Sequence, residues 1–394
     1  MSQPILFISG MFRSGTTLLG RMLNAHPEIS VASDPYLDFF KHLRSAVGEE
    51  LGIKVNPSEP IDDYYFLSPQ RELFQRIRTS TLDRPFNPQL IPQLMDTINT
   101  RASTYCPLIC DHLSTNVGKG DKTFEDVFNS LLTVLTNAYG KKSAKYIGFK
   151  EVWANEFIPA FAHSYENARF IQILRDPRAV SASKNAKDAC YPWLFLGRQW
   201  RKITATSWLN QHDDKFGAKV LTIKYEDLVS KPVETSKNIC NFLELDFSKE
   251  MADASSFVDG GGRPWKQNSN YVAGGASFDS GAIDRWRSIM TERERALIDF
   301  LCHPEMTLFD YVPQVTPDLD EDLLISPPVM SKDRLAGWVQ GMSNQSPLAA
   351  AIEMRHESLR YDLLHLSGDK FDRLNRELVS GCFLDDKIAT EVRK

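Results

Sequence analysis

The chain has 394 residues, 42% hydrophobic and 25% charged, and can therefore bury the core of a globular protein larger than one average domain. Its net charge of −5 gives no electrostatic footprint for nucleic acid or for an anionic membrane surface. No apolar run approaches the roughly 20 residues that span a bilayer, and no charged leader precedes a hydrophobic stretch at the N-terminus. We expect a cytoplasmic protein with no nucleic-acid or membrane partner.

The six cysteines are scattered along the chain, which is typical of reduced thiols rather than of a disulfide framework. Cys106, Cys110 and His112 form one local cluster. No second half-site with a recognised ligand spacing follows it. We therefore expect small buried thiols here and no metal site.

The N-terminal stretch predicts a strand, a tight turn and a helix in succession. Residues 4–9 form a short apolar run, typical of a buried parallel strand. Gly10 and Gly15 bracket a loop in which backbone amides can converge, and apolar residues recur at helical spacing from Thr16 onward. The free amides and the helix dipole both favour a bound phosphate.

This loop departs from the phosphate loop of nucleotide triphosphatases at one position. Gly10 and Gly15 have the correct spacing, but Thr16 occupies the lysine position and the cation is Arg13 instead. Such a loop suits a 5′-phosphate that carries sulfate, without Mg²⁺, better than it suits ATP. An ordinary strand-turn-helix with incidental glycines is the alternative.

The following segments predict an α/β protein with a parallel sheet. Asp34 and Pro35 are placed as the N-cap and first residue of a helix that runs to about Leu43. Residues 46–144 predict a helical insertion that forms a substrate-side wall, with helices at 69–78, 89–98 and 124–139. Strands are predicted at 146–150, 169–174 and 219–223, and parallel strands place their carboxyl ends at one edge, where ligands bind.

The C-terminal third predicts a functional loop, a long helix, a linker and an extension. The glycine-rich loop covers 255–280 and the helix covers 283–302. We assign residues 1–312 to the main domain, 313–330 to an acidic, proline-rich linker and 331–394 to a helical extension. The apolar stripe of this extension either packs on its own chain or forms a homodimer.

The run Arg13-Ser14-Gly15-Thr16-Thr17, followed by Ala25-His26-Pro27, resembles the 5′-phosphosulfate loop of sulfotransferases that use 3′-phosphoadenosine-5′-phosphosulfate (PAPS). The resemblance is to the branch of tyrosylprotein sulfotransferases and their bacterial relatives. It implies a P-loop-like sheet flanked by helices, with transfer of a sulfuryl group from PAPS to a hydroxyl or amine and 3′,5′-adenosine bisphosphate as product. Residues 13–17 would then hold the 5′ end of the donor.

A second motif begins after the strand at 169–174. It resembles the family's 3′-phosphate motif, which implies that Arg175 and Ser183 hold the ribose 3′-phosphate. The alternative is an Asp-Pro helix start with Arg175 in a surface salt bridge. Arg178 is expected to pair with carboxylates.

The acceptor must lose a proton as it attacks, so a general base is expected near the first loop. The resemblance places this base at Asp34, unless Asp34 is only an N-cap. Tyr36 occupies the position of a family arginine, which argues against the same peptide substrate. The other candidates for the base are His26, Glu28, Asp111 and His112.

The resemblance implies further roles at the strand ends. Lys150 would join Arg13 in an electrostatic clamp on the sulfuryl or bridging oxygen, unless it is an ordinary solvated lysine. Tyr225 would contact the 3′ side of the donor, unless it is a core tyrosine. Trp265 would stack on adenine, and Lys266 would reach a phosphate.

These features predict metal-independent, in-line sulfuryl transfer to a small-molecule or glycan acceptor. A P-loop kinase or NTPase is the enzymatic alternative, against which the missing lysine at Thr16 argues. The third possible function is a non-catalytic nucleotide-binding scaffold that assembles through the C-terminal helices.

Overall fold

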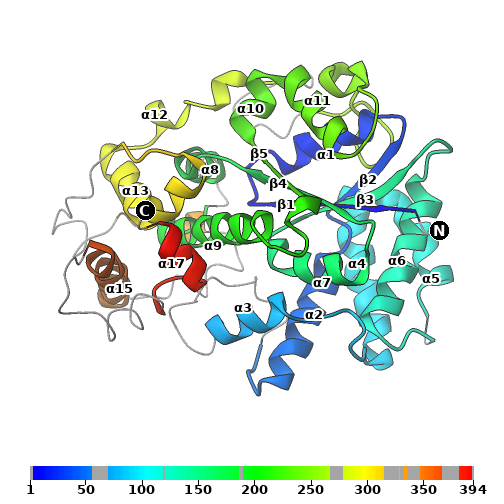
Figure 1. The fold of residues 1–394 in the computed structure, drawn as a ribbon, viewed down its shortest axis with the longest axis horizontal. Coiled ribbons are helices and arrows are strands. Elements are labelled where there is room, and N and C mark those ends of the chain that lie inside the picture. Colours follow the sequence, from blue (N-terminus) through cyan, green and yellow to red (C-terminus); the bar gives the residue numbers. More distant parts are fainter. Residues whose placement is uncertain are drawn as a thin grey trace. The chain divides into compact units, whose positions relative to one another are not determined.

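The computed structural model describes residues 3–55, 70–118, 120–185, 190–266, 278–314, 328, 332–335, 347–365 and 381–392 (Figure 1). The chain divides into two compact units. The first contains residues 1–61, 73–174 and 210–280, and the second contains 62–72, 175–209 and 281–394. Most of the predicted linker at 313–330 lies outside the described residues, so the predicted domain boundaries stay predictions.

The first unit is built on a five-stranded sheet with the order β2-β3-β1-β4-β5, in which every neighbouring pair is parallel. This confirms the predicted fold class. The segment before Asp34 forms the edge strand β2. The strands are β1 (Ile5–Gly10), β2 (Ile29–Ser33), β3 (Tyr146–Val152), β4 (Arg169–Leu174) and β5 (Val220–Lys224).

Helices cover both faces of this sheet (Figure 1). One face carries α1 (Thr16–Ala25), with α10 (Tyr225–Ser230) and α11 (Pro232–Phe242) on the same side. On the other face, Phe7 packs among Phe40, Phe149 and Phe161. The helices around this aromatic core are α2 (Leu37–Glu50), α4 (Ile91–Tyr105), α5 (Cys110–Asn116), α6 (Phe124–Tyr139) and α7 (Ile158–Ser164).

Two predicted helices differ from the observed ones. The helix expected to start at Asp34 begins at Leu37 with Tyr36 at its N-cap, so the N-cap role of Asp34 is wrong. The helix expected at 283–302 is two helices, α12 (Trp286–Ile289) and α13 (Glu292–Met306). The break follows from a capping box in which Thr291 and Glu294 each accept the other's backbone N–H.

In the second unit, a buried carboxylate contributes to holding α15 (Pro347–His365). Ile352 and Leu359 of the predicted apolar stripe are 50% and 55% exposed, and the side chains of its other members lie outside the described part of the chain. The buried carboxylate of Glu357 pairs instead with Arg198 and Arg201 at 2.7 Å each. The remaining helices are α3 (Gln70–Arg78), α8 (Pro177–Lys184), α9 (Trp193–Gln211), and α17 (Asp386–Glu391), of which α3 and α9 each have residues in both units.

Two glycines shape the turn between β1 and α1. A Cβ atom at Gly10 would lie 2.4 Å from the carbonyl oxygen of Ile173 in β4. Gly15 has a φ of +87°, and a Cβ there would lie 2.4 Å from the ring of Tyr225. The turn therefore needs glycine at Gly15 both for its backbone conformation and for the close approach of the ring.

Replacing Glu357 by Gln should destabilise the second unit. Burial alone would raise the pKa of Glu357, but Arg201 and Arg198 lower it to about 2. The carboxylate thus stabilises the fold above its unfolded pKa near 4.5, and this contribution is lost as the pH falls towards 2. Denaturant unfolding should show a loss of about 3–5 kcal/mol at pH 7 that shrinks in acid. Glu353→Gln is the control: the Glu353 side chain is 25% exposed and pairs with Arg198 at 2.7 Å, so its loss should cost less than about 1 kcal/mol.

Replacing Gly15 by Ala should lower the free energy of unfolding by about 1–3 kcal/mol, because alanine is strained at positive φ and its methyl group meets Tyr225. Gly20→Ala in α1 is the matched control, since the nearest atom to its new Cβ is 3.8 Å away. That variant should be stabilised by about 0.5–1 kcal/mol. Equal behaviour of the two variants in thermal unfolding would contradict the strained turn.

Candidate functional site

The carboxyl ends of β1, β2 and β3 bring the predicted catalytic groups to one edge of the sheet. The parallel register places Gly10 beside Val152 and Ser33 beside Lys150. Directly beyond these ends lie Arg13, Asp34 and Trp153, with φ values of 63°, 53° and 61°. They are three of the five non-glycine residues with positive φ in the described chain. Such strained backbone clusters at functional sites.

The turn before α1 has the features of an oxyanion site. The N-cap of α1 is Gly15, which has no side chain to accept hydrogen bonds from the first-turn amides. The hydroxyl of Ser14 is fully buried, and no hydrogen-bond partner for it exists among the described residues. Buried polar groups are normally hydrogen-bonded, so both features fit a ligand that carries acceptor oxygens. Tyr225, the first residue of α10, forms one wall of this turn through its ring contact with Gly15.

Asp34 and Lys150 form an ion pair at this edge. The side chain of Lys150 is 1% exposed, and its Nζ donates to Asp34 Oδ2. The backbone N–H of Asp34 also donates to the carbonyl oxygen of Lys150 at 2.7 Å. The interpretation of Lys150 as a solvated lysine is therefore wrong. Its ammonium group is held against the carboxylate of Asp34 at the carboxyl ends of β2 and β3.

Arg101 and Glu151 complete this cluster, and neither was a predicted site residue. Arg101 Nε donates to the carbonyl oxygen of Asp34 at 3.0 Å. Its Nη2 lies 3.5 Å from Asp34 Oδ1 and 3.7 Å from Glu151 Oε2. Glu151 Oε1 accepts the backbone N–H of Tyr36. Arg101 comes from α4, so a segment without a recognisable motif positions Asp34.

The buried carboxyl of Glu151 has a raised pKa. Burial raises the pKa of Glu151 to about 8, Arg101 opposes this rise, and the nearby Asp34 adds to it. A carboxyl that keeps its proton does not repel a neighbouring carboxylate, so the raised pKa of Glu151 lets it lie close to Asp34 in a low-dielectric site.

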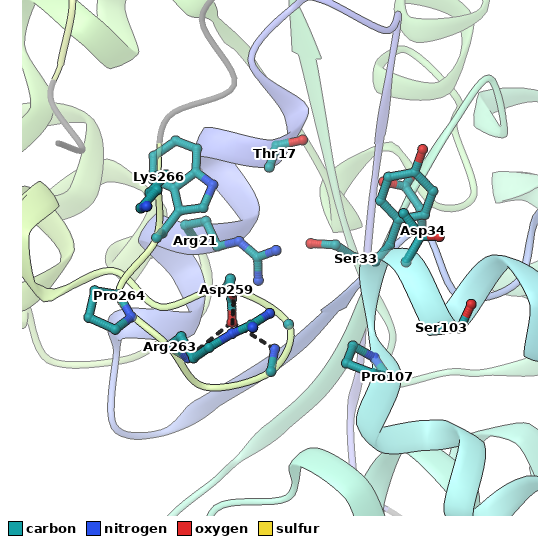
Figure 2. A pocket seen from close by; sticks show the side chains of 15 residues that line it. Thr17, Arg21, Ser33, Asp34, Ser103, Pro107, Asp259, Arg263, Pro264 and Lys266 are labelled. Carbon is teal, nitrogen blue, oxygen red and sulfur yellow. Dashed lines mark hydrogen bonds and ion pairs between the residues drawn. The ribbon is translucent and has the colours of Figure 1, made fainter. Parts of the chain in front are cut away.

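A cavity of about 720 Å³ opens beside these groups (Figure 2). Of the predicted residues, Thr17, Asp34, Trp265 and Lys266 line it. The predicted helical insertion lines it too, through the end of α4 and the segment after it. The other lining residues are Arg21, Ser33, Ser103, Thr104, Tyr105, Pro107, Asp259, Gly260, Gly261, Arg263 and Pro264.

Trp265 is held in place by its own segment. Its backbone N–H donates to the carbonyl oxygen of Phe257 at 2.8 Å, and the two rings are 6.3 Å apart. Asp259 lies in the turn between them and accepts from Arg263 Nε at 3.2 Å. Residues 267–277 of the predicted loop lie outside the described residues.

Two alternatives to Asp34 as the base have structural roles instead. His26 ends α1, where its Nδ1 accepts the N–H of Glu28 and its Nε2 contacts the carbonyl oxygen of Asp246 at 2.9 Å. Glu28 precedes β2, at the opposite edge of the sheet from Asp34, and pairs with Lys145 at 2.9 Å.

Arg175 and Ser183 lie in the second unit, where both are buried. Arg175 follows the last residue of β4 and donates to the carbonyl oxygen of Ala282 at 2.6 Å, so the surface salt bridge proposed as its alternative role is wrong. Asp176 does cap α8, and Arg178 pairs with Asp176 and with Asp299, as expected. The role of Arg175 and Ser183 at a 3′-phosphate stays a prediction.

The described residues contain no helix that combines the length and apolar character of a membrane span. They also contain no group of three or more His, Cys, Asp or Glu side chains placed to hold a metal ion. All six cysteines are unpaired, and burial raises the pKa of Cys106.

Comparisons with known proteins give a family for this geometry. A protein of Caenorhabditis elegans named protein-tyrosine sulfotransferase is 25% identical over 146 residues, which are 34% of this chain. The matched region spans 54% of that relative's length. Carbohydrate sulfotransferase 1 of Danio rerio is 22% identical over 279 residues, covering 63% of this chain and 64% of its own.

Solved structures are similar as well. The sulfotransferase domain of the Synechococcus PCC 7002 olefin synthase has a TM-score of 0.44 at 20% identity, with 76% of this chain and 93% of that domain covered. Retinol dehydratase in complex with retinol and PAP has a TM-score of 0.36 at 14% identity, with 80% and 84% covered. The model of the sulfotransferase family matches residues 4–249, well over half of the sequence. The chain therefore belongs to the sulfotransferase family.

Proposed function

We propose that this protein transfers the sulfuryl group of PAPS to a hydroxyl or amine of a small-molecule or glycan acceptor, without a metal ion. The observation that carries the proposal is the ion pair of Asp34 with the buried Lys150, at the sheet edge where β1 enters the glycine turn. A proton acceptor, a cation and an anion-binding turn thus meet within the first unit. Membership of the sulfotransferase family supports this assignment.

The turn before α1 would hold the 5′ end of the donor. The uncapped amides of Thr16 and Thr17 and the buried Ser14 hydroxyl can donate to phosphosulfate oxygens, and Gly15 keeps the backbone accessible. Arg13 would lie at the bridging oxygen. PAPS supplies a sulfuryl group on a phosphate that leaves readily. Its remaining contacts would come from Tyr225, Trp265, Lys266, Arg175 and Ser183.

Asp34 would accept the proton of the acceptor hydroxyl while the hydroxyl oxygen forms its bond to sulfur and the bond from sulfur to the 5′-phosphate oxygen breaks. Protonation of Asp34 removes the negative charge that Lys150 faces in the free protein. The Lys150 ammonium and the Arg13 guanidinium can then stabilise the charge that develops on the departing oxygen. Arg101 keeps Asp34 in position throughout, since it contacts both the backbone and the carboxylate.

Tyr36 separates this protein from sulfotransferases that use an arginine at that position for a peptide. Its side chain is fully buried, and its hydroxyl donates to the carbonyl oxygen of Leu131 at 2.7 Å. Tyr36 therefore supports the core and is not available to an acceptor. The relative named carbohydrate sulfotransferase 1 supports a hydroxyl acceptor of the glycan or small-molecule class.

The Asp34→Asn variant tests this function. In calorimetry with EDTA, both wild type and variant should bind 3′,5′-adenosine bisphosphate. In a separate titration without EDTA, ATP with Mg²⁺ should bind more weakly. Turnover of PAPS with an acceptor panel should fall by about 10²–10⁴ in the variant, because the proton acceptor is lost. Asp38→Asn removes a carboxylate paired with Lys41 at 3.2 Å and should leave turnover unchanged. Preferential, metal-dependent ATP binding would instead indicate a kinase or NTPase, and bisphosphate binding without any transfer would indicate a scaffold.

A further inference from the structure

Arg21 carries a buried charge that the protein itself does not neutralise by direct contact. It lies on α1 and is only 7% exposed. Among the described residues, no hydrogen bond or ion pair reaches its guanidinium, and its buried Nε has no partner. Figure 2 shows the guanidinium directed into the cavity, between Asp259 and the segment that carries Ser33 and Asp34.

An unpaired cation in such a place is unfavourable for the free protein. Burial lowers the pKa of Arg21, although Asp259 and Asp34 oppose this effect. Both of these carboxylates already have other partners. Asp259 accepts from Arg263 and from the backbone N–H of Gly261, and Asp34 is paired with Lys150. No described residue therefore supplies a direct counter-charge to Arg21, and a ligand in the cavity can supply one.

We propose that Arg21 binds an oxyanion of the acceptor, such as a carboxylate, so that this site selects acidic acceptors. The inference deepens the proposed function and rests on it. A guanidinium can hold a carboxylate through two parallel hydrogen bonds, which gives both affinity and orientation. The hydroxyl of Thr104, on the cavity wall formed by α4, can donate a further hydrogen bond, whereas that of Ser103 already donates to the carbonyl oxygen of Thr100.

The position of Arg21 on α1 separates it from the donor turn. Arg21 follows Thr17 by four residues, so the two side chains share one face of the helix with their Cβ atoms about 5–6 Å apart. The first-turn amides at Thr17 face the 5′ end of the donor, whereas Arg21 lies one turn farther along. An acceptor with its hydroxyl at Asp34 can therefore place a second, anionic group at Arg21 in the same cavity.

The cavity as a whole favours such a ligand. Arg21, Arg263 and Lys266 line it with positive charge, against the carboxylates of Asp34 and Asp259. Lys150 and Arg101 add two further cations directly behind Asp34. The surplus of positive charge remains even when both carboxylates are ionised.

The test uses two matched pairs of acceptors, each pair differing only in charge: 4-hydroxyphenylacetate with its amide, and methyl glucuronoside with its uronamide. Calorimetry on the full chain saturated with 3′,5′-adenosine bisphosphate should show at least tenfold tighter binding of the acid in one pair. The aryl pair and the sugar pair then distinguish a small aromatic acceptor from a glycan. Arg21→Gln should abolish this preference, and Arg21→Lys should retain part of it. Arg263→Gln is the control: its side chain lines the same cavity but is 79% exposed and paired with Asp259, so its loss should reduce the preference for the acid less than twofold.

A second measurement needs no acceptor. Arg21→Met should unfold at a higher temperature than the wild type in the absence of ligand, because it removes an unpaired buried charge and keeps the side-chain volume. A lower unfolding temperature would assign Arg21 a structural role and overturn the proposal. Two results of the acceptor titrations would also overturn it. One is equal binding of acid and amide within both pairs, including no binding of either. The other is a preference for the acid that survives in Arg21→Gln.

Binding of 3′,5′-adenosine bisphosphate distinguishes failure of the acceptor inference from failure of the proposed function. If Arg21→Gln weakens bisphosphate binding tenfold, Arg21 belongs to the donor and the acceptor assignment is wrong. If the wild type does not bind the bisphosphate at all, the proposed function itself fails. Bisphosphate binding without an acid preference contradicts the acceptor inference alone.

Discussion

The ion pair between Asp34 and Lys150 is the interaction on which the site depends. It joins the ends of two neighbouring parallel strands, and the backbone bond from Asp34 to the carbonyl of Lys150 fixes the same connection. The Lys150 side chain is 1% exposed, so Asp34 is the partner that makes its burial tolerable. The pair in turn holds the carboxylate of Asp34 in place. The parallel sheet puts this carboxylate at the same edge as the glycine turn, with β3 between the strands β2 and β1.

The buried polar groups around this pair fall into two classes. Arg101 and Glu151 have partners within the protein, so they make the position of Asp34 rigid before any ligand arrives. The hydroxyl of Ser14 and the guanidinium of Arg21 have none within the described residues. The first class is typical of a preorganised catalytic group, and the second is typical of groups whose partners are supplied by ligands. Asp34, the proposed base, thus belongs with the groups that have partners in the protein. Ser14 and Arg21, the proposed contacts to donor and acceptor, belong with those that have none among the described residues.

The parts of the site that sequence could predict are those with a local pattern. The glycine spacing predicted the turn before α1, and the family resemblance pointed to Asp34 and Lys150. Both lie at the carboxyl ends of parallel strands, which share one edge of the sheet. Arg101 and Arg21 could not be found in this way, since each lies in an amphipathic helix where arginine usually faces solvent. The same expectation failed for α15, whose buried face carries Glu357 while Ile352 is exposed. Burial of a charge depends on partners far away in the sequence, and composition and periodicity do not contain that information.

A double-mutant cycle on Asp34→Asn and Lys150→Met tests the central ion pair most directly. The measured quantity is the free energy of unfolding in denaturant at pH 7. Each single change should cost about 3–5 kcal/mol because it leaves the other charge buried and unpaired. The double variant should then cost less than the sum by at least about 1.5 kcal/mol. Additive losses, within about 0.5 kcal/mol, would show that the two charges do not interact in solution and would contradict this account of the site.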